Sequence, residues 1–129
     1  MTLMIGNYSM GTILVVDDEV EACKVLDEYL SAKGHEVHMS HNGASAIEKM
    51  KSVRPHLVLL DMLMPGMKGA EALKEMKKID PNVKIVMVTV VTDEEEACKT
   101  FELGAYDYIT KPVNLAHLDK IIRGAMTES

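Results

Sequence analysis

The chain has 129 residues, of which 47% are hydrophobic and 26% charged, and a formal net charge of −6. A single globular domain with its own core is expected, and the acidic balance argues against direct binding to nucleic acid, because phosphate contacts require a basic surface. No apolar run approaches the roughly 18–20 residues that cross a bilayer, and residues 1–12 lack the pattern of a signal peptide, so a cytoplasmic location without membrane contact is expected.

The beginning of the chain differs from the rest. Residues 1–11 show no clear apolar period, so a flexible N-terminal leader is expected there. From residue 12 onward, short apolar runs alternate with stretches of helical periodicity, and neither a low-complexity tract nor an internal repeat interrupts them. This pattern predicts one folded domain over residues 12–126.

Five short runs rich in β-branched and aliphatic residues predict strands. These runs cover residues 12–16, 36–41, 57–60, 84–89 and 106–110. The second run is the most polar and is expected at a sheet edge, whereas the central runs are continuously apolar. Continuous apolar strands are typical of a parallel sheet that helices cover on both faces.

Each predicted strand is followed by a stretch in which apolar residues recur at helical spacing, and turn or capping residues mark the helix ends. Gly34 ends the first helix, and Asn42 and Gly43 lead into the second. A Thr-x-x-Glu capping box from Thr92 opens the fourth, and Asn114 caps the last. Five strand–helix units predict an α/β fold with a five-stranded parallel sheet and helices on both faces.

Polar side chains stand at the ends of four predicted strands. They are Asp17 and Asp18, Asp61, Thr89 and Lys111. A single strand-end aspartate is usually a helix cap, but the carboxyl ends of parallel strands meet on one rim, so these side chains are expected to gather. Carboxylate oxygens are the ligands that Mg²⁺ or Mn²⁺ prefers, and a lysine and a threonine can bind phosphate. The residue types therefore predict phosphoryl transfer onto an aspartate.

Four segments, in this order, resemble the receiver domain of two-component response regulators, of the chemotaxis-regulator type. They are ILVVDDE at 13–19, LVLLDMLMPGMKG at 57–69, VMVT at 86–89 and YDYITKP at 106–112. The resemblance implies that residues 12–126 form a response regulator receiver domain with a flavodoxin-like (βα)5 fold and strand order 2-1-3-4-5. It also implies that the domain is a signalling phosphoacceptor rather than an enzyme. The phosphoryl group would come from a sensor histidine kinase or a histidine phosphotransfer protein.

The resemblance implies roles for the acids. Asp61 would be the phosphoacceptor, and Mg²⁺ would be held by Asp17, Asp18, Asp61 and the backbone carbonyl of Leu63. Leu63 and Val91, two positions after the phosphoacceptor and after the threonine, are apolar and cannot orient an attacking water. We therefore expect slow self-dephosphorylation.

The resemblance also implies roles for the later strands. Thr89 and Lys111 would bind the phosphoryl oxygens, and the Lys111–Pro112 peptide bond would be cis. Tyr108 would form a switch with Thr89, and phosphorylation would shift an inactive–active equilibrium on the face made by the fourth helix, fifth strand and fifth helix. The output partner and a phosphorylation-dependent homodimer stay open.

Three other functions compete with this interpretation. A haloacid-dehalogenase-type Mg²⁺ phosphatase also uses a strand-end aspartate, but it requires a second aspartate where Leu63 stands. A receiver used only for protein interaction would not need the complete set of acids, Thr89 and Lys111. A flavin- or nucleotide-binding domain requires a phosphate-cradling loop after the first strand, and this loop is acidic.

The cysteines and three histidines are given structural interpretations. Cys23 and Cys98 form no CxxC pair and are expected to be reduced thiols. His35, His38 and His41 invite a metal hypothesis, but three-residue offsets on a strand alternate between its faces. We therefore expect these histidines to be exposed to solvent on an edge strand.

Overall fold

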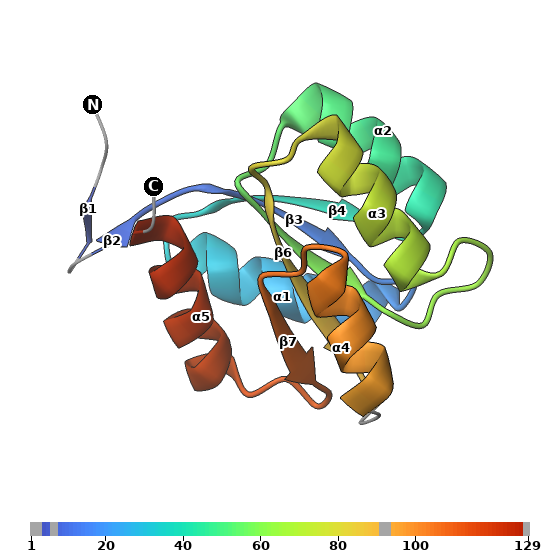
Figure 1. Ribbon diagram of the computed structural model, residues 1–129. Helices are drawn as coiled ribbons and strands as arrows, with labels where there is room; N and C mark the ends of the chain where they lie inside the picture. Colours follow the sequence, from blue (N-terminus) through green and yellow to red (C-terminus); the bar gives the residue numbers. More distant parts are fainter. Residues whose placement is uncertain (1–3, 6–7, 91–93, 128–129) are drawn as a thin grey trace.

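Figure 1 shows the computed structural model of the chain, which describes residues 4–5, 8–90 and 94–127. One sheet has five parallel strands in the order β4-β3-β5-β6-β7. When β3 is counted as the first strand of this sheet, that is the predicted order 2-1-3-4-5, which is thereby confirmed. Its strands are β3 (Thr12–Val16), β4 (Glu36–Ser40), β5 (Leu57–Asp61), β6 (Lys84–Thr89) and β7 (Asp107–Thr110). The helices are α1 (Val20–Ala32), α2 (Gly43–Val53), α3 (Gly69–Ile79), α4 (Glu94–Glu102) and α5 (Leu115–Thr127).

The core lies in two layers, one on each face of this sheet. Alternate residues of the central strands point to opposite faces, so β3, β5 and β6 contribute apolar side chains to both layers. One layer packs against α1 and α5, and the other against α2 and α3, as the arrangement of these helices in Figure 1 shows. Residues of β5 are buried along its whole length, whereas β4 at the edge is largely half-exposed, as its polar sequence predicted.

Local signals mark several of the helix ends. Gly34 lies in the left-handed region with φ of +98°, just after Lys33, the C-cap of α1, as its position predicted. The side chain of Asn42 accepts a hydrogen bond from the Ser45 N–H, and that of Asn114 accepts one from the His117 N–H. Thr92 of the predicted capping box lies outside the described residues. In the part of the chain that the structure describes, no helix combines the length and the apolar character that crossing a bilayer requires.

A small second sheet precedes the main one. Strands β1 (Met4–Ile5) and β2 (Tyr8–Ser9) pair antiparallel, and β2 lies beside α5. This pairing falls within residues 1–11, where the sequence predicts a leader without regular structure. The flexibility of that leader stays a prediction.

The predicted exposure of the three histidines is wrong for His35, which is buried. His35 stands one residue before β4 and not on it, so the alternation of strand faces does not apply to it. Its Nδ1 accepts a hydrogen bond from the Gly11 N–H at 3.1 Å, and this bond ties the start of β3 to the start of β4. His38 is half-exposed and lies 2.8 Å from a carboxylate oxygen of Glu36, and His41 is exposed.

We predict that His35 makes the protein less stable in mild acid. Burial lowers the pKa of His35, although the Gly11 hydrogen bond and the charge of Asp119 oppose this shift. The unfolded chain therefore binds a proton near the ordinary pKa of about 6.5, before the folded protein does. Stability is complete above that pH and falls as the pH drops below it, with a slope of at most about 1.4 kcal/mol per pH unit for one proton.

Urea denaturation at about pH 7.5 and about pH 5.5 measures this effect. The loss of unfolding free energy between the two pH values is expected to be smaller in His35→Gln than in the wild type. His38→Gln is the matched control, because this half-exposed histidine lies on the same edge of the sheet. Equal losses in the wild type and His35→Gln would contradict the prediction.

Candidate functional site

Three carboxylates meet at the carboxyl rim of the sheet. Asp17 and Asp18 directly follow β3, and Asp61 is the last residue of β5, the strand paired with β3. Each offers a carboxylate oxygen, and these three oxygens lie within 4.8 Å of one another. Asp17 and Asp61 are buried, and Asp18 is exposed. Negative charges this close repel one another, and a nearby cation offsets that repulsion.

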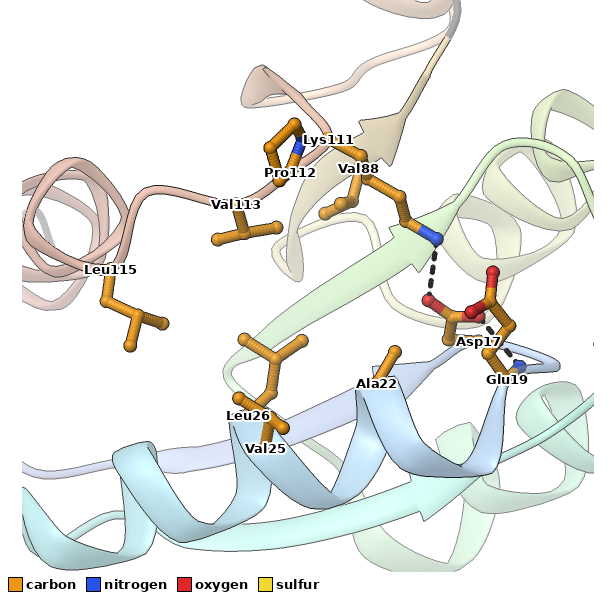
Figure 2. Close-up of a pocket in the computed structure, with 10 residues that line it drawn as sticks. All are labelled: Asp17, Glu19, Ala22, Val25, Leu26, Val88, Lys111, Pro112, Val113 and Leu115. Carbon is orange, nitrogen blue, oxygen red and sulfur yellow. Dashed lines mark hydrogen bonds and ion pairs between the residues drawn. The ribbon is translucent and has the colours of Figure 1, made fainter.

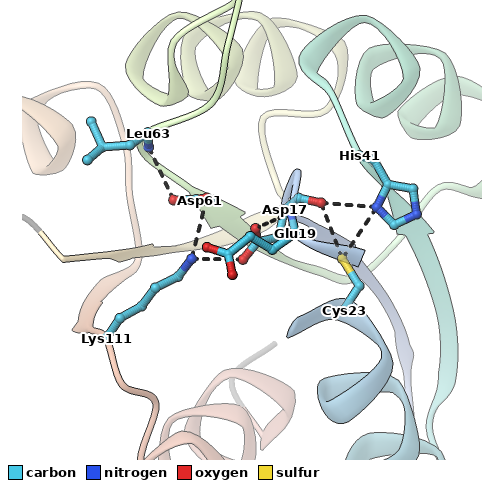
Figure 3. Close-up of polar contacts among 7 residues, drawn as sticks. All are labelled: Asp17, Glu19, Cys23, His41, Asp61, Leu63 and Lys111. Atoms are coloured by element: carbon cyan, nitrogen blue, oxygen red, sulfur yellow. Dashed lines mark hydrogen bonds and ion pairs between the residues drawn. The ribbon is translucent and has the colours of Figure 1, made fainter. Parts of the chain in front are cut away.

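Lys111 supplies such a cation. Its Nζ lies 2.9 Å from Oδ2 of Asp17 and 3.4 Å from Oδ2 of Asp61, as Figure 3 shows. Burial disfavours the charged ammonium, but the hydrogen bond and charge of Asp17, together with Asp61, outweigh it and raise the pKa of Lys111. The peptide bond from Lys111 to Pro112 is cis, which is the isomer that the resemblance implied.

Backbone amides orient both buried carboxylates. Oδ1 of Asp17 accepts the Glu19 N–H at 2.9 Å, and Oδ1 of Asp61 accepts the Leu63 N–H at 3.1 Å. Burial raises the pKa of Asp61 above its ordinary value, and the charge of Asp17 adds to this shift, while the Leu63 amide and Lys111 oppose it. The negative charge of Asp61 is therefore unfavourable beside that of Asp17, and a cation bound next to both carboxylates would stabilise them.

Thr89 and Tyr108 lie on the two strands beyond Asp61. Asp61 pairs with Val88, so Thr89 ends β6 one residue further along, and its side chain is fully buried. The Thr89 carbonyl accepts the Lys111 N–H at 2.7 Å, which holds the end of β6 against the loop that carries the lysine. Tyr108 on β7 is half-buried and packs against the core layer on the α2–α3 face.

Besides a cavity of about 620 Å³ whose lining includes Asp18 and Leu63, two cavities adjoin the buried acids Asp17 and Asp61. One, of about 220 Å³, lies over Asp61 and is lined by Asp18, Glu19, Asp61, Leu63, Val90 and Lys111. The other, of about 300 Å³, opens between α1 and the start of α5 and shares Asp17, Glu19 and Lys111 with the acidic site (Figure 2). The rest of its lining is apolar and comprises Ala22, Val25, Leu26, Val88, Pro112, Val113 and Leu115. Apolar surface thus lies directly beside the charged groups.

The sequence interpretation missed contacts to the main chain of Asp17. It assigned no site residue to the end of the second strand, yet the Ser40 carbonyl accepts the Asp17 N–H, and His41 Nδ1 lies 3.0 Å from the Asp17 carbonyl oxygen. The thiol of Cys23 donates to the same oxygen at 3.4 Å. The strand-end rule that found the acids would also have found His41, whereas no sequence pattern points to Cys23.

The two cysteines are free, as expected, but their surroundings differ. Cys23 is buried and Cys98 is exposed. Burial raises the pKa of the Cys23 thiol to about 11, and the charge of Asp17 adds to this shift. At neutral pH the Cys23 side chain is therefore an S–H donor.

Gly69, the first residue of α3, packs against the backbone just behind Asp61. Its N–H donates to the Met62 carbonyl at 3.0 Å. A Cβ atom at this position would lie 2.5 Å from Cα of Met62 and 2.9 Å from the carbonyl oxygen of Asp61. Both neighbours are backbone atoms, so the strand end that carries Asp61 would have to move.

We predict that Gly69→Ala lowers the free energy of unfolding by about 1–3 kcal/mol, the range for overpacked sites. Gly124→Ala is the matched control, because a Cβ there would meet only the Tyr106 hydroxyl at an ordinary 3.5 Å. In the interior of α5 this control is expected to raise stability by about 0.5–1 kcal/mol. Urea denaturation of both variants measures the difference, and a Gly69→Ala protein as stable as the wild type would contradict it.

The fold and the site together define a class of protein: a doubly wound α/β domain with an acidic cluster and a lysine at the carboxyl rim of its parallel sheet. The family model of the response regulator receiver domain matches residues 13–123. The chain therefore belongs to the response regulator receiver domain family. This is a family of signalling phosphoacceptors rather than catalytic enzymes, and its acidic triad is typical of a receiver Mg²⁺ site.

Individual relatives agree with this assignment. The chain is 34% identical over 111 residues to the sporulation initiation phosphotransferase F of Bacillus subtilis, covering 86% of this chain and 90% of that protein. It is 33% identical over 118 residues to the regulatory protein AtoC of Escherichia coli, covering 92% of this chain but 26% of that protein.

Among solved structures, the chain is similar to a CheY-like response regulator receiver domain protein from Methanospirillum hungatei. The TM-score is 0.89 at 31% identity, with 93% of this chain and 96% of that chain covered. The match in three dimensions thus extends over nearly all of both chains. Against longer curated relatives such as AtoC, this chain spans about a quarter of the length.

Proposed function

We propose that this domain accepts a phosphoryl group on Asp61 from a phosphohistidine of a sensor histidine kinase or a histidine phosphotransfer protein. Receiver domains generally pair with histidine kinases. The observation that carries the proposal is that Asp61, buried at a strand end, lies within 4.8 Å of two further carboxylates and in contact with Lys111. A structural carboxylate would not need so many charged neighbours.

The reaction is a transfer between two nucleophiles. A carboxylate oxygen of Asp61 forms the new P–O bond while the P–N bond to the donor histidine breaks, and the bonding electron pair stays on the histidine nitrogen. The ammonium group of Lys111, beside Asp61, is proposed to stabilise the negative charge of the incoming phosphoryl group. The hydroxyl of Thr89 is proposed to donate a hydrogen bond to a phosphoryl oxygen. The Leu63 amide on Oδ1 keeps the carboxylate in a defined orientation.

The donor set fits a hard divalent cation. Asp17, Asp18 and Asp61 present carboxylate oxygens at close range, and Mg²⁺ prefers such ligands over nitrogen or sulfur. We propose that these acids and the backbone carbonyl of Leu63 hold Mg²⁺, with Mn²⁺ as a substitute. When bound, the cation neutralises the acids and the phosphoryl oxygens.

The output side of the proposal concerns the neighbouring strand and helices. Thr89 and Tyr108 are proposed as the switch pair, because β6 and β7 are adjacent strands and Tyr108 packs into the core layer. A face formed by α4, β7 and α5 would then transmit the change to a partner, an attached domain or a second copy of the chain. The apolar cavity beside Asp17 is proposed as part of the surface that receives the phosphohistidine-bearing partner.

Intact-mass measurement after incubation with a small phosphodonor and Mg²⁺ tests the proposal. We expect an adduct of about 80 Da, the mass of one phosphoryl group, that forms with Mg²⁺ and not with excess chelator. Absence of the adduct, also with a phosphorylated histidine donor protein, would instead favour a domain used only for interaction. Multiple turnover of a phosphomonoester would favour the phosphatase alternative.

Once formed, the phosphorylated domain is expected to lose its phosphoryl group slowly. Leu63 is 55% exposed and lines the cavity over Asp61, where an apolar side chain cannot orient a water for attack. We predict that Leu63→Asn accelerates the decay about tenfold, which is less than the 10²–10⁴ of a true general base. Val91, the other position of this prediction, lies outside the described residues.

The decay of the adduct with time, followed by mass spectrometry, measures this rate. Leu103→Asn is the matched control, because Leu103 is also exposed but follows the far end of α4. An unchanged decay rate in Leu63→Asn would contradict the prediction that the apolar side chain of Leu63 slows the reaction.

A further inference from the structure

We propose that Cys23 and His41 are positioning residues for the cation site, because together they hold the backbone carbonyl of Asp17 and thereby the carboxylate that binds the metal. The inference rests on the proposed cation site and assigns a role to two residues that do not touch the cation themselves. It predicts that the two side chains affect metal affinity beyond any effect on overall stability.

Both side chains reach one oxygen atom. The Cys23 thiol lies 3.4 Å from the Asp17 carbonyl oxygen, and His41 Nδ1 lies 3.0 Å from it, as Figure 3 shows. A carbonyl oxygen has two lone pairs and only accepts, so it takes one hydrogen bond from the thiol and one from an Nδ1–H. The two donors also contact each other, at 3.7 Å between Sγ and Nδ1. We refer to Cys23 and His41, which both bond the Asp17 carbonyl oxygen, as the clamp.

The clamp joins three elements. Cys23 lies in the first turn of α1, His41 directly follows β4, and Asp17 directly follows β3. The Asp17 N–H donates to the Ser40 carbonyl at 3.1 Å. The Asp17 N–H is therefore bonded to β4, and the Asp17 carbonyl is bonded to Cys23 of α1 and to His41, which follows β4. Cys23 is fully buried and His41 is exposed, so the two side chains reach the Asp17 carbonyl from the core and from the surface.

The carboxylate of Asp17 follows from the position of its main chain. Its Oδ1 accepts the Glu19 N–H at 2.9 Å, and its Oδ2 accepts from Lys111 at 2.9 Å. The side chain has a single methylene group, so a shift of the carbonyl moves the carboxylate with it. Partners that orient metal ligands typically contribute about 10- to 100-fold in metal affinity when they bond the ligand itself. We expect a smaller effect here, because the clamp acts through the backbone.

Mg²⁺ titration of the wild type and variants, followed by the amide NMR signals of the site, tests the inference. Cys23→Ala and His41→Leu each remove one donor, and each is expected to weaken Mg²⁺ binding about three- to tenfold. Cys23→Ser and His41→Asn keep a donor and are expected to restore part of the affinity. Cys98→Ser and His38→Leu, at positions away from the clamp, are expected to bind Mg²⁺ as the wild type does.

A second readout uses the thiol directly. In a Cys98→Ser background only Cys23 can react, and Mg²⁺ is expected to slow its labelling by a thiol reagent, because cation and thiol order the same residue. Cys98 in a Cys23→Ser background is expected to label at the same rate with and without Mg²⁺.

The outcomes separate this inference from the proposed function. Folded Cys23→Ala and His41→Leu proteins that bind Mg²⁺ with wild-type affinity would overturn it, even if they are less stable. A wild-type protein that binds no Mg²⁺ would overturn it as well. A wild-type protein that binds Mg²⁺ but takes up no phosphoryl group would refute only the proposed function. If Cys23→Ala does not fold, the Cys23→Ser and His41 variants decide.

Discussion

We expect an Asp61→Asn variant to take up no phosphoryl group in the intact-mass assay, under the conditions that convert the wild type if the proposed function holds. The amide of asparagine has nearly the shape of the carboxylate but is not a nucleophile, so no acyl phosphate forms. The neighbours that orient the group, the Leu63 amide and Lys111, are unchanged. The expected effect is therefore a complete loss of the adduct.

This loss is not expected to reflect unfolding. Burial raises the pKa of Asp61, so the folded protein holds this proton more tightly than the unfolded chain, and ionisation at neutral pH lowers stability. Stability from this group is complete below its ordinary pKa and decreases as the pH rises through the raised value. Removing the charge is therefore expected to leave the free energy of unfolding at neutral pH unchanged or higher.

Asp27→Asn is the matched control, because Asp27 lies on α1, where its carboxylate accepts a hydrogen bond from the hydroxyl of the exposed Ser31 at 2.8 Å. The control is expected to form the adduct as the wild type does. A phosphoryl group found on Asp61→Asn, mapped by peptide analysis to Asp17 or Asp18, would contradict the assignment of Asp61.

Lys111→Met has the second largest expected effect and changes both reactivity and stability. Loss of a positioned cation at the reacting group is expected to lower the rate of phosphoryl uptake about 100- to 1000-fold. The pKa of Lys111 is raised in the folded protein, so its charged form stabilises the fold at neutral pH, and this stability is lost as the pH rises through the raised pKa. Without Lys111 the two buried carboxylates lose their nearest positive charge.

In metal-free buffer we expect Lys111→Met to lower the free energy of unfolding by about 1–3 kcal/mol, less than for a fully buried pair, because the lysine side chain is 19% exposed. Added Mg²⁺ is expected to restore part of this loss, since a cation at the acids replaces the missing charge. Urea denaturation with and without Mg²⁺ measures both effects.

Two further variants sharpen the test. Lys111→Arg keeps the positive charge and is expected to keep most of the stability, but its planar guanidinium cannot replace a compact ammonium at the phosphoryl group, so uptake stays slow. Lys120→Met removes an exposed lysine from α5 and is expected to change neither property. A Lys111→Met protein that takes up phosphoryl groups at the wild-type rate would refute the role of this lysine.

Much of the fold could be predicted from the sequence. The predicted strands over 12–16 and 84–89 coincide with β3 and β6, and each of the other three differs from the observed strand by one residue at one end. Local properties suffice here, because an apolar run, a left-handed glycine or a capping asparagine acts within a few residues. Exceptions arise where a residue stands just outside its element, as His35 does before β4.

The composition of the site could also be predicted, because parallel strands end on one rim and the polar residues at those ends are visible in the sequence. The sequence by itself determined that Asp17, Asp18, Asp61 and Lys111 lie together. The role of the Thr89 side chain at this site stays a prediction. The sequence also contained the Gly34 and Asn114 signals that end and begin helices.

Only the tertiary structure decided which atoms meet. Lys111 bridges Asp17 and Asp61 across 94 and 50 positions of the chain. The clamp on the Asp17 carbonyl and the close approach of Gly69 to Met62 likewise appear only after folding. The physical reason is that such contacts depend on strand order, register and the packing of helices on the sheet, which arise from the whole core at once and not from any local stretch of residues.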